Sequence, residues 1–413
     1  MKKWLSVKKI ALGLFVALAV VLSVGVIAVD QHTLSGSEQQ NVSMNLDEFY
    51  LPPRVENVTV DEHYVRQTTV ANEQSEKIKA FWGEQAPEYF SGFYVGANGL
   101  TLLVTCDPAE IDDEIQETAG EPRVNILQVS YSLVELEQIM ARFDANVQQR
   151  LKADPEAVRF VKGYGIDVVR NRFSVDVYTA GDADARADYA KTVFDWADTE
   201  SGIVLVESDK AYEPKAAINA GVKDWVTNAT IGGISTITCC GTSVNASGIT
   251  ERGFFIAGHA AQLYNQMKIG GTTVGTVSAR ALGGQMDVAF VHLDIPSSYT
   301  PSKSLSTSYS IDGSAACGNV GTPYSMHGMS TGINAGVVNN TSFTFITEDG
   351  RSYSNFIRMQ MNAQLGDSGG PLVASNGDYS RVIVGIMSSG DGTYSNFTKF
   401  DVAASAFNFT LQP

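Results

Sequence analysis

The sequence predicts a mixed α+β region followed by an all-β domain that begins near residue 228. Upstream of that point, β-branched runs alternate with stretches in which apolar residues recur at helical spacing. Downstream, Gly, Ser, Thr and Asn become frequent and short apolar runs alternate with turn residues, a texture typical of a β-sandwich or barrel. The chain has 413 residues, 44% of them hydrophobic, which suffices for more than one domain with a sizeable core.

The first 29 residues have the pattern of an export signal. Four lysines precede an uninterrupted apolar run from Ile10 to Val29. We expect a signal peptide that is removed after export, which predicts a secreted protein. The apolar run is also long enough to span a bilayer. A retained signal anchor, with the rest of the chain on the exported face of the membrane, is therefore the alternative.

Five segments are expected between this signal and the C-terminus. Residues 30–75 are polar and acidic, and they predict a poorly ordered tether. Two small α+β lobes follow over about 76–155 and 156–209, and a linker then runs to residue 227. The all-β domain occupies 228–413.

The first lobe is expected to begin with a helix near 75–82. A hairpin follows around Asn98-Gly99, a dipeptide that favours tight hairpin turns, and a strand follows at 124–131. Ser132 and Glu135 form a capping box that opens a second helix. Apolar residues share one face of that helix, which we interpret as core packing: Leu133, Leu136, Met140, Phe143, Val147 and Leu151.

The second lobe repeats the mixed pattern. A hairpin is expected around Arg170-Asn171-Arg172, which separates two β-branched runs. A helix over 183–198 and a strand over 202–207 complete the lobe.

Charge is concentrated in the middle of the chain. Residues 30–228 carry 17 basic and 35 acidic side chains, whereas residues 229–413 carry 8 basic and 10 acidic ones. Binding of nucleic acid needs a basic footprint, so this balance argues against nucleic acid as a partner. No Cys-x-x-Cys pair or histidine cluster suggests a metal site, and no cofactor is expected.

The four cysteines of an exported chain permit disulfides. They are Cys106, Cys239, Cys240 and Cys317, and they allow three pairings among which the sequence does not choose. Because Cys239 and Cys240 are adjacent, each is expected to bond elsewhere rather than to the other.

The hexapeptide Gly366–Pro371, which reads Gly-Asp-Ser-Gly-Gly-Pro, is the most specific motif in the chain. A serine hydroxyl becomes a good nucleophile at neutral pH only when a base takes its proton. The flanking glycines let the backbone turn tightly, so that Ser368 can project into a cleft beside exposed N–H groups. The motif predicts a nucleophile, provided that the chain also supplies a base and an acid.

His259 and Asp287 are the predicted base and acid. Three histidines lie in the all-β domain, and only His259 follows an apolar run at a strand end, where a rigid scaffold can hold a base open to a cleft. His292 lies within a strand, and His327 lies in a loop rich in glycine and serine. Asp287 opens an apolar strand, where an unpaired carboxylate would be costly, so we expect it to orient His259.

The motif around Ser368 also fits the nucleophile elbow of α/β-hydrolases, Gly-x-Ser-x-Gly. In that fold the catalytic histidine follows the serine, and no histidine follows Ser368 in this sequence. The order here is His259, Asp287, Ser368, which is the chymotrypsin order.

These residues resemble the chymotrypsin-like serine peptidases. The compact spacing is most similar to the bacterial α-lytic protease and streptogrisin group. The resemblance covers most of residues 228–413 and rests on these stretches: Ile256–His259, Met286–Val291, Val320–Gly332, Gly366–Pro371, Gly385–Gly390 and Phe400–Leu411.

The resemblance implies two six-stranded antiparallel β-barrels with a C-terminal helix. It also implies a serine endopeptidase that acts as a monomer on peptide and protein substrates through an acyl-enzyme. His259, Asp287 and Ser368 would form the catalytic triad. The backbone N–H groups of Gly366 and Ser368 would form the oxyanion hole.

The substrate-binding residues are likewise implied by the resemblance. Ser388, Ser389 and Gly390 would pair with the substrate backbone as an added strand. Met387 would line the specificity pocket, which implies an apolar residue before the scissile bond (P1). Core packing is the alternative role for Met387.

In this resemblance the upstream lobes correspond to a propeptide that assists folding and inhibits the product. Self-cleavage near Asn228–Gly233 would then release the mature enzyme from a zymogen. The alternative is a binding protein that keeps the protease fold without activity.

Two positions depart from the family pattern. Ala260 follows the histidine where the family often has a cysteine. Ser325-Met326-His327 stands where the family usually carries an arginine that pairs with the aspartate before the serine. The partner of Asp367 is therefore open, with His327 a candidate.

Overall fold

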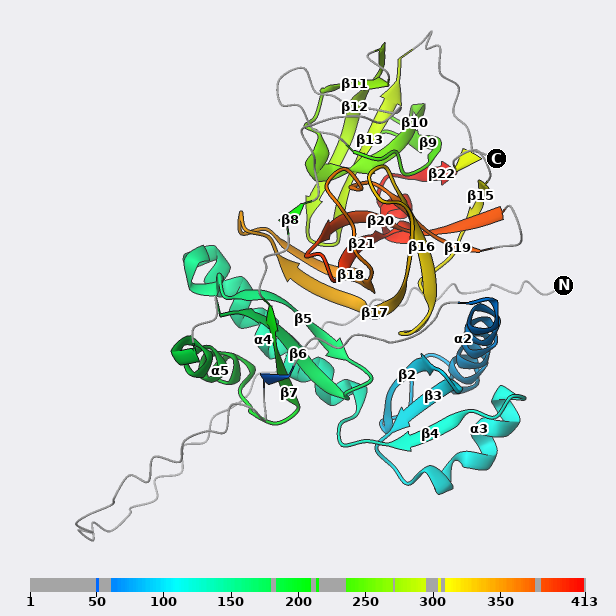
Figure 1. Ribbon diagram of the computed structural model, residues 1–413, viewed down its shortest axis with the longest axis vertical. Helices are drawn as coiled ribbons and strands as arrows, with labels where there is room; N and C mark the ends of the chain where they lie inside the picture. Colours follow the sequence, from blue (N-terminus) through cyan, green and yellow to red (C-terminus); the bar gives the residue numbers. More distant parts are fainter. Residues whose placement is uncertain are drawn as a thin grey trace, which may run out of the picture. The chain divides into compact units, whose positions relative to one another are not determined.

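Figure 1 shows the helices and strands of the computed structural model. The predicted export signal at 1–29 and the predicted cleavage site at 228–233 lie outside the residues that the structure describes. The described residues are 50–51, 61–179, 183–208, 213–214, 235–269, 272–294, 304–305, 309–375 and 380–411.

The first lobe is a three-stranded sheet packed against two helices. Strand β2 forms the predicted hairpin with β3, and β4 lies parallel to β3. Apolar residues of both helices share one core with β2 and β3. The elements are α2 (Glu62–Trp82), β2 (Phe90–Gly96), β3 (Gly99–Val104), the 3-10 turn η1 (Pro108–Glu110), α3 (Asp112–Ala119) and β4 (Asn125–Gln128).

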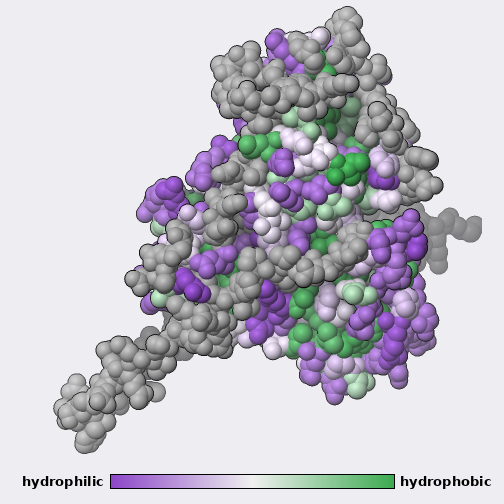
Figure 2. All heavy atoms as spheres, in the orientation of Figure 1, coloured by the Kyte–Doolittle hydropathy of each residue, from purple (hydrophilic) through white to green (hydrophobic). Residues whose placement is uncertain are grey.

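The predicted tether over 30–75 is wrong at its C-terminal end, because helix α2 already begins at Glu62. Asp61 caps the helix by accepting a hydrogen bond from the Tyr64 N–H at 2.8 Å. The buried side of α2 includes polar side chains such as Gln74, so the segment lacks the apolar stripe that marks a helix in a sequence. Its outward side is covered by hydrophilic side chains (Figure 2).

The second lobe is a sheet in the order β7-β6-β5 with two helices. Strands β5 and β6 are antiparallel, β6 and β7 are parallel, and β1 (Tyr50–Leu51) extends the sheet beside β7. The capping box of Ser132 and Glu135 is confirmed. The elements are α4 (Leu133–Ala153), the 3-10 turn η2 (Pro155–Val158), β5 (Val161–Asp167), β6 (Arg172–Tyr178), α5 (Ala183–Ala197) and β7 (Ile203–Ser208).

The predicted lobe boundary at residue 155 is wrong. The apolar face of α4, including Leu136, Phe143 and Val147, packs in one core with β5, β6, β7 and α5. Helix α4 therefore belongs to the second lobe, and the boundary lies between β4 and α4. The face was read correctly as core packing, but its partners follow it in the chain.

The first part of the all-β domain is a six-stranded antiparallel sheet in the order β11-β12-β13-β10-β9-β22. Among the described residues, no pairing joins the two end strands, β11 and β22. The strands are β9 (Cys240–Val244), β10 (Thr250–Ala257), β11 (Gln266–Ile269), β12 (Thr272–Gly283), β13 (Met286–Leu293) and β22 (Phe409–Leu411).

The second part contains six antiparallel strands that pair in a ring. The order is β16-β17-β18-β21-β20-β19, and β19 pairs again with β16. A short hairpin of β14 (Ser304–Leu305) and β15 (Tyr309–Ser314) joins β20 in parallel. The ring strands are β16 (Pro323–Gly328), β17 (Gly332–Ile346), β18 (Ser352–Gln360), β19 (Pro371–Ser375), β20 (Ser380–Gly390) and β21 (Ser395–Lys399).

The C-terminal tail holds the two sheets together. Helix α6 (Phe400–Ala406) is the predicted C-terminal helix, but it is short, and the tail ends in strand β22. One core combines Phe400 and Phe409 of the tail with Phe255 from β10 and Ile386 from β20. This shared core fixes β10 and β13 against β19 and β20.

The expected disulfides do not form: no disulfide joins the four cysteines, all of which lie within the described residues. Each cysteine packs against a different apolar cluster. Cys106 lies in the first lobe, Cys239 in the core shared by the two sheets, Cys240 in the core of the six-stranded sheet, and Cys317 beside the core of the ring. Adjacent residues of a strand point to opposite faces, which separates Cys239 from Cys240.

Candidate active site

Ser368 lies in the loop between β18 and β19, and its neighbouring glycines are required by the backbone. Gly366 has φ of 101° and Gly369 has φ of 84°, values that L side chains rarely adopt. A Cβ at Gly369 would come within 2.2 Å of the Thr236 carbonyl oxygen. The predicted oxyanion-hole residues, Gly366 and Ser368, are both part of this tight loop.

His259 and Asp287 are brought together by the pairing of two strands. His259 follows β10 in a short 3-10 turn, η3 (Gly258–Ala260), and Asp287 is the second residue of β13. Strands β10 and β13 are antiparallel with Ala257 opposite Val288, so the end of one strand meets the start of the other. Local strand patterns thus deliver both side chains to one edge.

The three predicted catalytic side chains form one hydrogen-bonded chain. His259 Nδ1 lies 2.6 Å from Asp287 Oδ2, and His259 Nε2 lies 3.0 Å from Ser368 Oγ. The backbone N–H of His259 also donates to Asp287 Oδ1 at 2.7 Å. Asp287 therefore holds His259 through both carboxylate oxygens, the imidazole through Oδ2 and the backbone through Oδ1.

Asp287 is ionised in this arrangement. Burial alone would raise its pKa, but the neighbouring His259, together with hydrogen bonds from His259 and Ser388, lowers the pKa below its ordinary value. An ionised carboxylate only accepts hydrogen bonds, so Nδ1 of His259 carries a proton. The lone pair of Nε2 then faces the hydroxyl of Ser368, as a general base requires.

Ser388 supports the carboxylate in a way that the sequence reading missed. Its hydroxyl donates to Asp287 Oδ2 at 2.6 Å and is buried with it. The Asp287 N–H donates to Thr398 Oγ1 at 3.1 Å. Ser388 was predicted only as part of the substrate-binding strand, because no local pattern links residues that are 101 positions apart.

The structure answers the open question about Asp367. Its carboxylate accepts hydrogen bonds from the backbone N–H groups of Gln364, Ser330 and Thr331, at 2.8, 2.8 and 3.1 Å. These amides stand in place of the arginine that the family pattern supplies. His327 packs edge-on against the Tyr309 ring instead, and burial together with Arg381 lowers its pKa to about 4.

The other described histidines lie outside this constellation. His292 is the penultimate residue of β13, where its Nδ1 lies 3.9 Å from a carboxylate oxygen of Glu251. His63 lies in α2. The structure therefore brings His259 to Ser368 and leaves the remaining candidates elsewhere.

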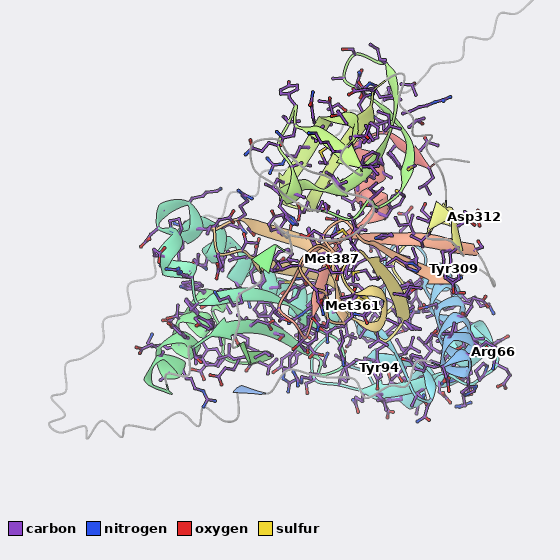
Figure 3. The ribbon with its side chains drawn as sticks, turned by 45° about the horizontal axis from the view of Figure 1, so that its top comes forward. Arg66, Tyr94, Tyr309, Asp312, Met361 and Met387 are labelled. Carbon is purple, nitrogen blue, oxygen red and sulfur yellow. The ribbon has the colours of Figure 1, made fainter. Side chains whose placement is uncertain are left out.

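The predicted substrate-binding residues end strand β20. Met387 is fully buried in the apolar core of the ring, which also contains Met361 (Figure 3). Ser389 and Gly390 pair with Pro214 and Glu213, which form the two-residue strand β8. A segment of the chain upstream of the all-β domain thus lies along the edge where a substrate strand is expected.

Hydroxyl groups at the start of the all-β domain bind the nucleophile loop, an anchoring that no local sequence pattern predicts. Ser235 Oγ donates to the Ser368 carbonyl at 2.7 Å, and Thr238 Oγ1 donates to the Gly369 carbonyl at 2.6 Å. Thr236 Oγ1 donates to the Gly366 carbonyl at 2.9 Å. The three side chains thus hold three of the peptide groups of the tight loop.

The described part of the chain contains neither a metal-binding cluster nor a membrane-spanning helix. No group of three or more His, Cys, Asp or Glu side chains is arranged to hold a metal ion there. No described helix is long and apolar enough to cross a membrane.

The all-β domain matches a known family model. Residues 227–410 match the family model described as Trypsin. Nocardiopsis protease is 24% identical, with a TM-score of 0.35, over 42% of this chain and 90% of its own. Thermobifida fusca protease A is 21% identical, with a TM-score of 0.35, over 42% of this chain and 89% of its own. Cellulomonas bogoriensis chymotrypsin is 24% identical, with a TM-score of 0.35, over 46% and 97%.

Proposed function

We propose that the chain is an exported precursor of a serine endopeptidase that cuts itself, since residues 227–410 match the family model described as Trypsin. We assign the chemistry to His259, Asp287 and Ser368. The observation that carries this assignment is the hydrogen-bonded chain from Asp287 through His259 to Ser368, with Nε2 at 3.0 Å from Oγ. The same geometry favours an active enzyme over an inactive protein with the same fold.

The reaction proceeds through an acyl-enzyme. Ser368 Oγ attacks the peptide carbonyl while His259 Nε2 takes the hydroxyl proton. The imidazolium then gives that proton to the leaving amine, and a water molecule repeats the sequence to release the acid. Asp287 stays ionised throughout, fixes the tautomer of His259 and stabilises the imidazolium.

The oxyanion hole that we propose consists of the N–H groups of Gly366 and Ser368. The positive φ of Gly366 supports this role, because it gives the loop the tight turn in which successive amides converge. Removing one such donor typically lowers kcat by about 10² to 10³.

Substrate would bind as an added strand along Ser389 and Gly390. The pairing of these residues with Pro214 and Glu213 supports this mode, since it is a strand addition within the chain itself. Met387 and Met361 lie in an apolar core cluster beside this edge, and on this basis we propose an apolar P1 residue.

The lobes would act as an inhibitory propeptide. Strand β8 occupies the substrate edge, and β5 of the second lobe pairs with β17 of the ring. Asp176 of β6 also forms an ion pair with Arg358 of β18 at 2.6 Å, with both side chains buried. These contacts support a precursor in which the active site is blocked until the linker is cut.

The test is the mass of the protein recovered from expression of the full chain with its export signal. We expect the wild type to yield a fragment that begins near Asn228–Gly233, and Ser368→Ala to yield the uncut precursor. Normal cutting of Ser368→Ala would refute self-processing. The N-terminal sequence of the uncut Ser368→Ala precursor also tests the retained signal anchor, which predicts that the precursor keeps residues 1–29.

A further inference from the structure

The peptide groups on both sides of Gly366 are held by hydroxyls from other segments. Ser330 Oγ donates to the Leu365 carbonyl at 2.5 Å, and Thr236 Oγ1 donates to the Gly366 carbonyl at 2.9 Å. Ser330 is anchored in turn, because its backbone N–H donates to Asp367 Oδ1 at 2.8 Å. The Ser330 hydroxyl therefore has a fixed direction relative to the nucleophile loop.

The bond to Leu365 bears directly on the oxyanion hole. In a trans peptide the C=O of Leu365 and the N–H of Gly366 point in opposite directions, so fixing one fixes the other. Gly366 has no Cβ and sits at φ of 101°, so this peptide can rotate at low steric cost. A rotated peptide would turn the Gly366 N–H away from the substrate carbonyl.

We propose that Ser330 is a positioning residue that holds the Gly366 amide in its active direction, an inference that rests on the proposed function of Ser368 and the oxyanion hole. The close packing supports it, because a Cβ at Gly366 would come within 2.5 Å of Ser330 Oγ. The analogous peptide before Ser368 is held within the loop, where the Gly370 N–H donates to the Asp367 carbonyl at 2.7 Å. Only the Leu365–Gly366 peptide depends on a side chain of the β16–β17 turn.

The expected effect is set by one hydrogen bond. Loss of this hydrogen bond shifts the balance between the two peptide directions by about two- to tenfold. Complete loss of the Gly366 donor would lower kcat by about 10² to 10³, which is the upper limit of the effect. Ser330 is exposed, so its truncation is not expected to disturb folding.

The experiment compares Ser330→Ala, Ser330→Thr and the control Ser278→Ala, each expressed as the full chain. Ser278 is another exposed serine whose hydroxyl donates to a carboxylate, Glu251, away from the site. We expect Ser330→Ala to lower kcat by about two- to tenfold with little change in KM, and Ser330→Thr to restore it. The concentration of processed enzyme is taken from intact mass, so that slower self-processing does not enter kcat.

A second readout separates positioning from general damage. A peptide aldehyde forms a covalent hemiacetal whose tetrahedral oxygen occupies the oxyanion hole, whereas the matching product acid forms no such adduct. We expect Ser330→Ala to weaken binding of the aldehyde by the same factor as it lowers kcat, and to leave binding of the product acid unchanged. The pH profile of kcat should stay that of the wild type.

The proposal would be overturned if Ser330→Ala kept the kcat and the aldehyde affinity of the wild type. It would also be overturned if the variant bound the aldehyde and the product acid more weakly by the same factor. Failure of the proposed function looks different. In that case Ser368→Ala would retain turnover, whatever Ser330→Ala does.

Discussion

Ser388→Ala is the substitution that most sharply tests how Asp287 is held. Asp287 accepts three hydrogen bonds, two from His259 and one from the Ser388 hydroxyl at 2.6 Å. Both Asp287 and Ser388 are buried, so water cannot replace the lost donor without rearrangement. Alanine removes this one bond and leaves the strand pairing of β20 intact.

The magnitude follows from the charge of the acceptor. A hydrogen bond to a buried charged group contributes about 1.5–3 kcal/mol, against about 0.5–1.5 kcal/mol when both partners are neutral. We therefore expect Ser388→Ala to lower the free energy of unfolding by about 1.5–3 kcal/mol at pH 7. The effect on kcat/KM should be well below the roughly 10⁴-fold loss that follows neutralisation of a triad aspartate.

The direction in which the stability loss of Ser388→Ala varies with pH follows from the pKa of Asp287. The folded pKa of Asp287 lies below its ordinary value of 3.8, so its contribution to stability is present above that value and is lost as pH falls through the folded pKa. The difference between Ser388→Ala and the wild type should thus be full at pH 7 and should shrink on acidification below about pH 4.

The assay is denaturant unfolding of the full chain in a Ser368→Ala background, which prevents self-digestion. Ser243→Ala is the matched control, because that buried hydroxyl donates to a neutral carbonyl, that of Phe407, at 2.6 Å. The control should cost about 1 kcal/mol at every pH. A loss for Ser388→Ala that does not shrink at any pH below 3.8 would refute the proposed support of an ionised Asp287.

Three further predictions concern the lobes and the second sheet. Asp176→Asn breaks the buried ion pair with Arg358, so the separated lobes should inhibit the mature enzyme at least about tenfold more weakly, measured by titration of activity. Lobes with the control Asp195→Asn should inhibit like the wild type, because the Asp195 carboxylate pairs with exposed Lys191. Equal inhibition by both variants would contradict the contact. Phe143→Ala leaves a cavity in the core of the second lobe and should lower its free energy of unfolding by about 3–5 kcal/mol, so the yield of active enzyme should fall while kcat per active site is unchanged. An unchanged yield would contradict a role of the lobe in folding. His327→Phe should flatten the stability curve between pH 6.5 and about 4, because the folded pKa of His327 lies below its ordinary value and the wild type loses stability as pH falls through that window; a wild-type slope in thermal unfolding would count against it.

The sequence was informative wherever a local pattern carries the structure. The hairpins of both lobes and the capping box at Ser132 follow from short-range chemistry, and the structure confirms them. His259 was predicted from its place at a strand end, and Asp287 from the cost of an unpaired carboxylate beside an apolar strand. Two local signals thus indicated side chains that the structure brings to 2.6 Å of each other.

The missed features depend on contacts between distant parts of the chain. The hydroxyls of Ser235 and Thr238 reach carbonyls more than a hundred residues away, and no residue type marks such a bond in advance. Helix α2 was missed because its buried side is partly polar. The face of α4 was recognised, but periodicity names no partner, which is why the lobe boundary was misplaced.

The most direct measurement of the central proposal is the position of a covalent label. The protein recovered from expression of the full chain is treated with a fluorophosphonate and digested, and the modified peptide is sequenced by tandem mass spectrometry. We predict one adduct, on Ser368, that is lost when His259→Ala removes the base. An unlabelled product, or an adduct on another serine, would contradict the assignment of Ser368 as the nucleophile.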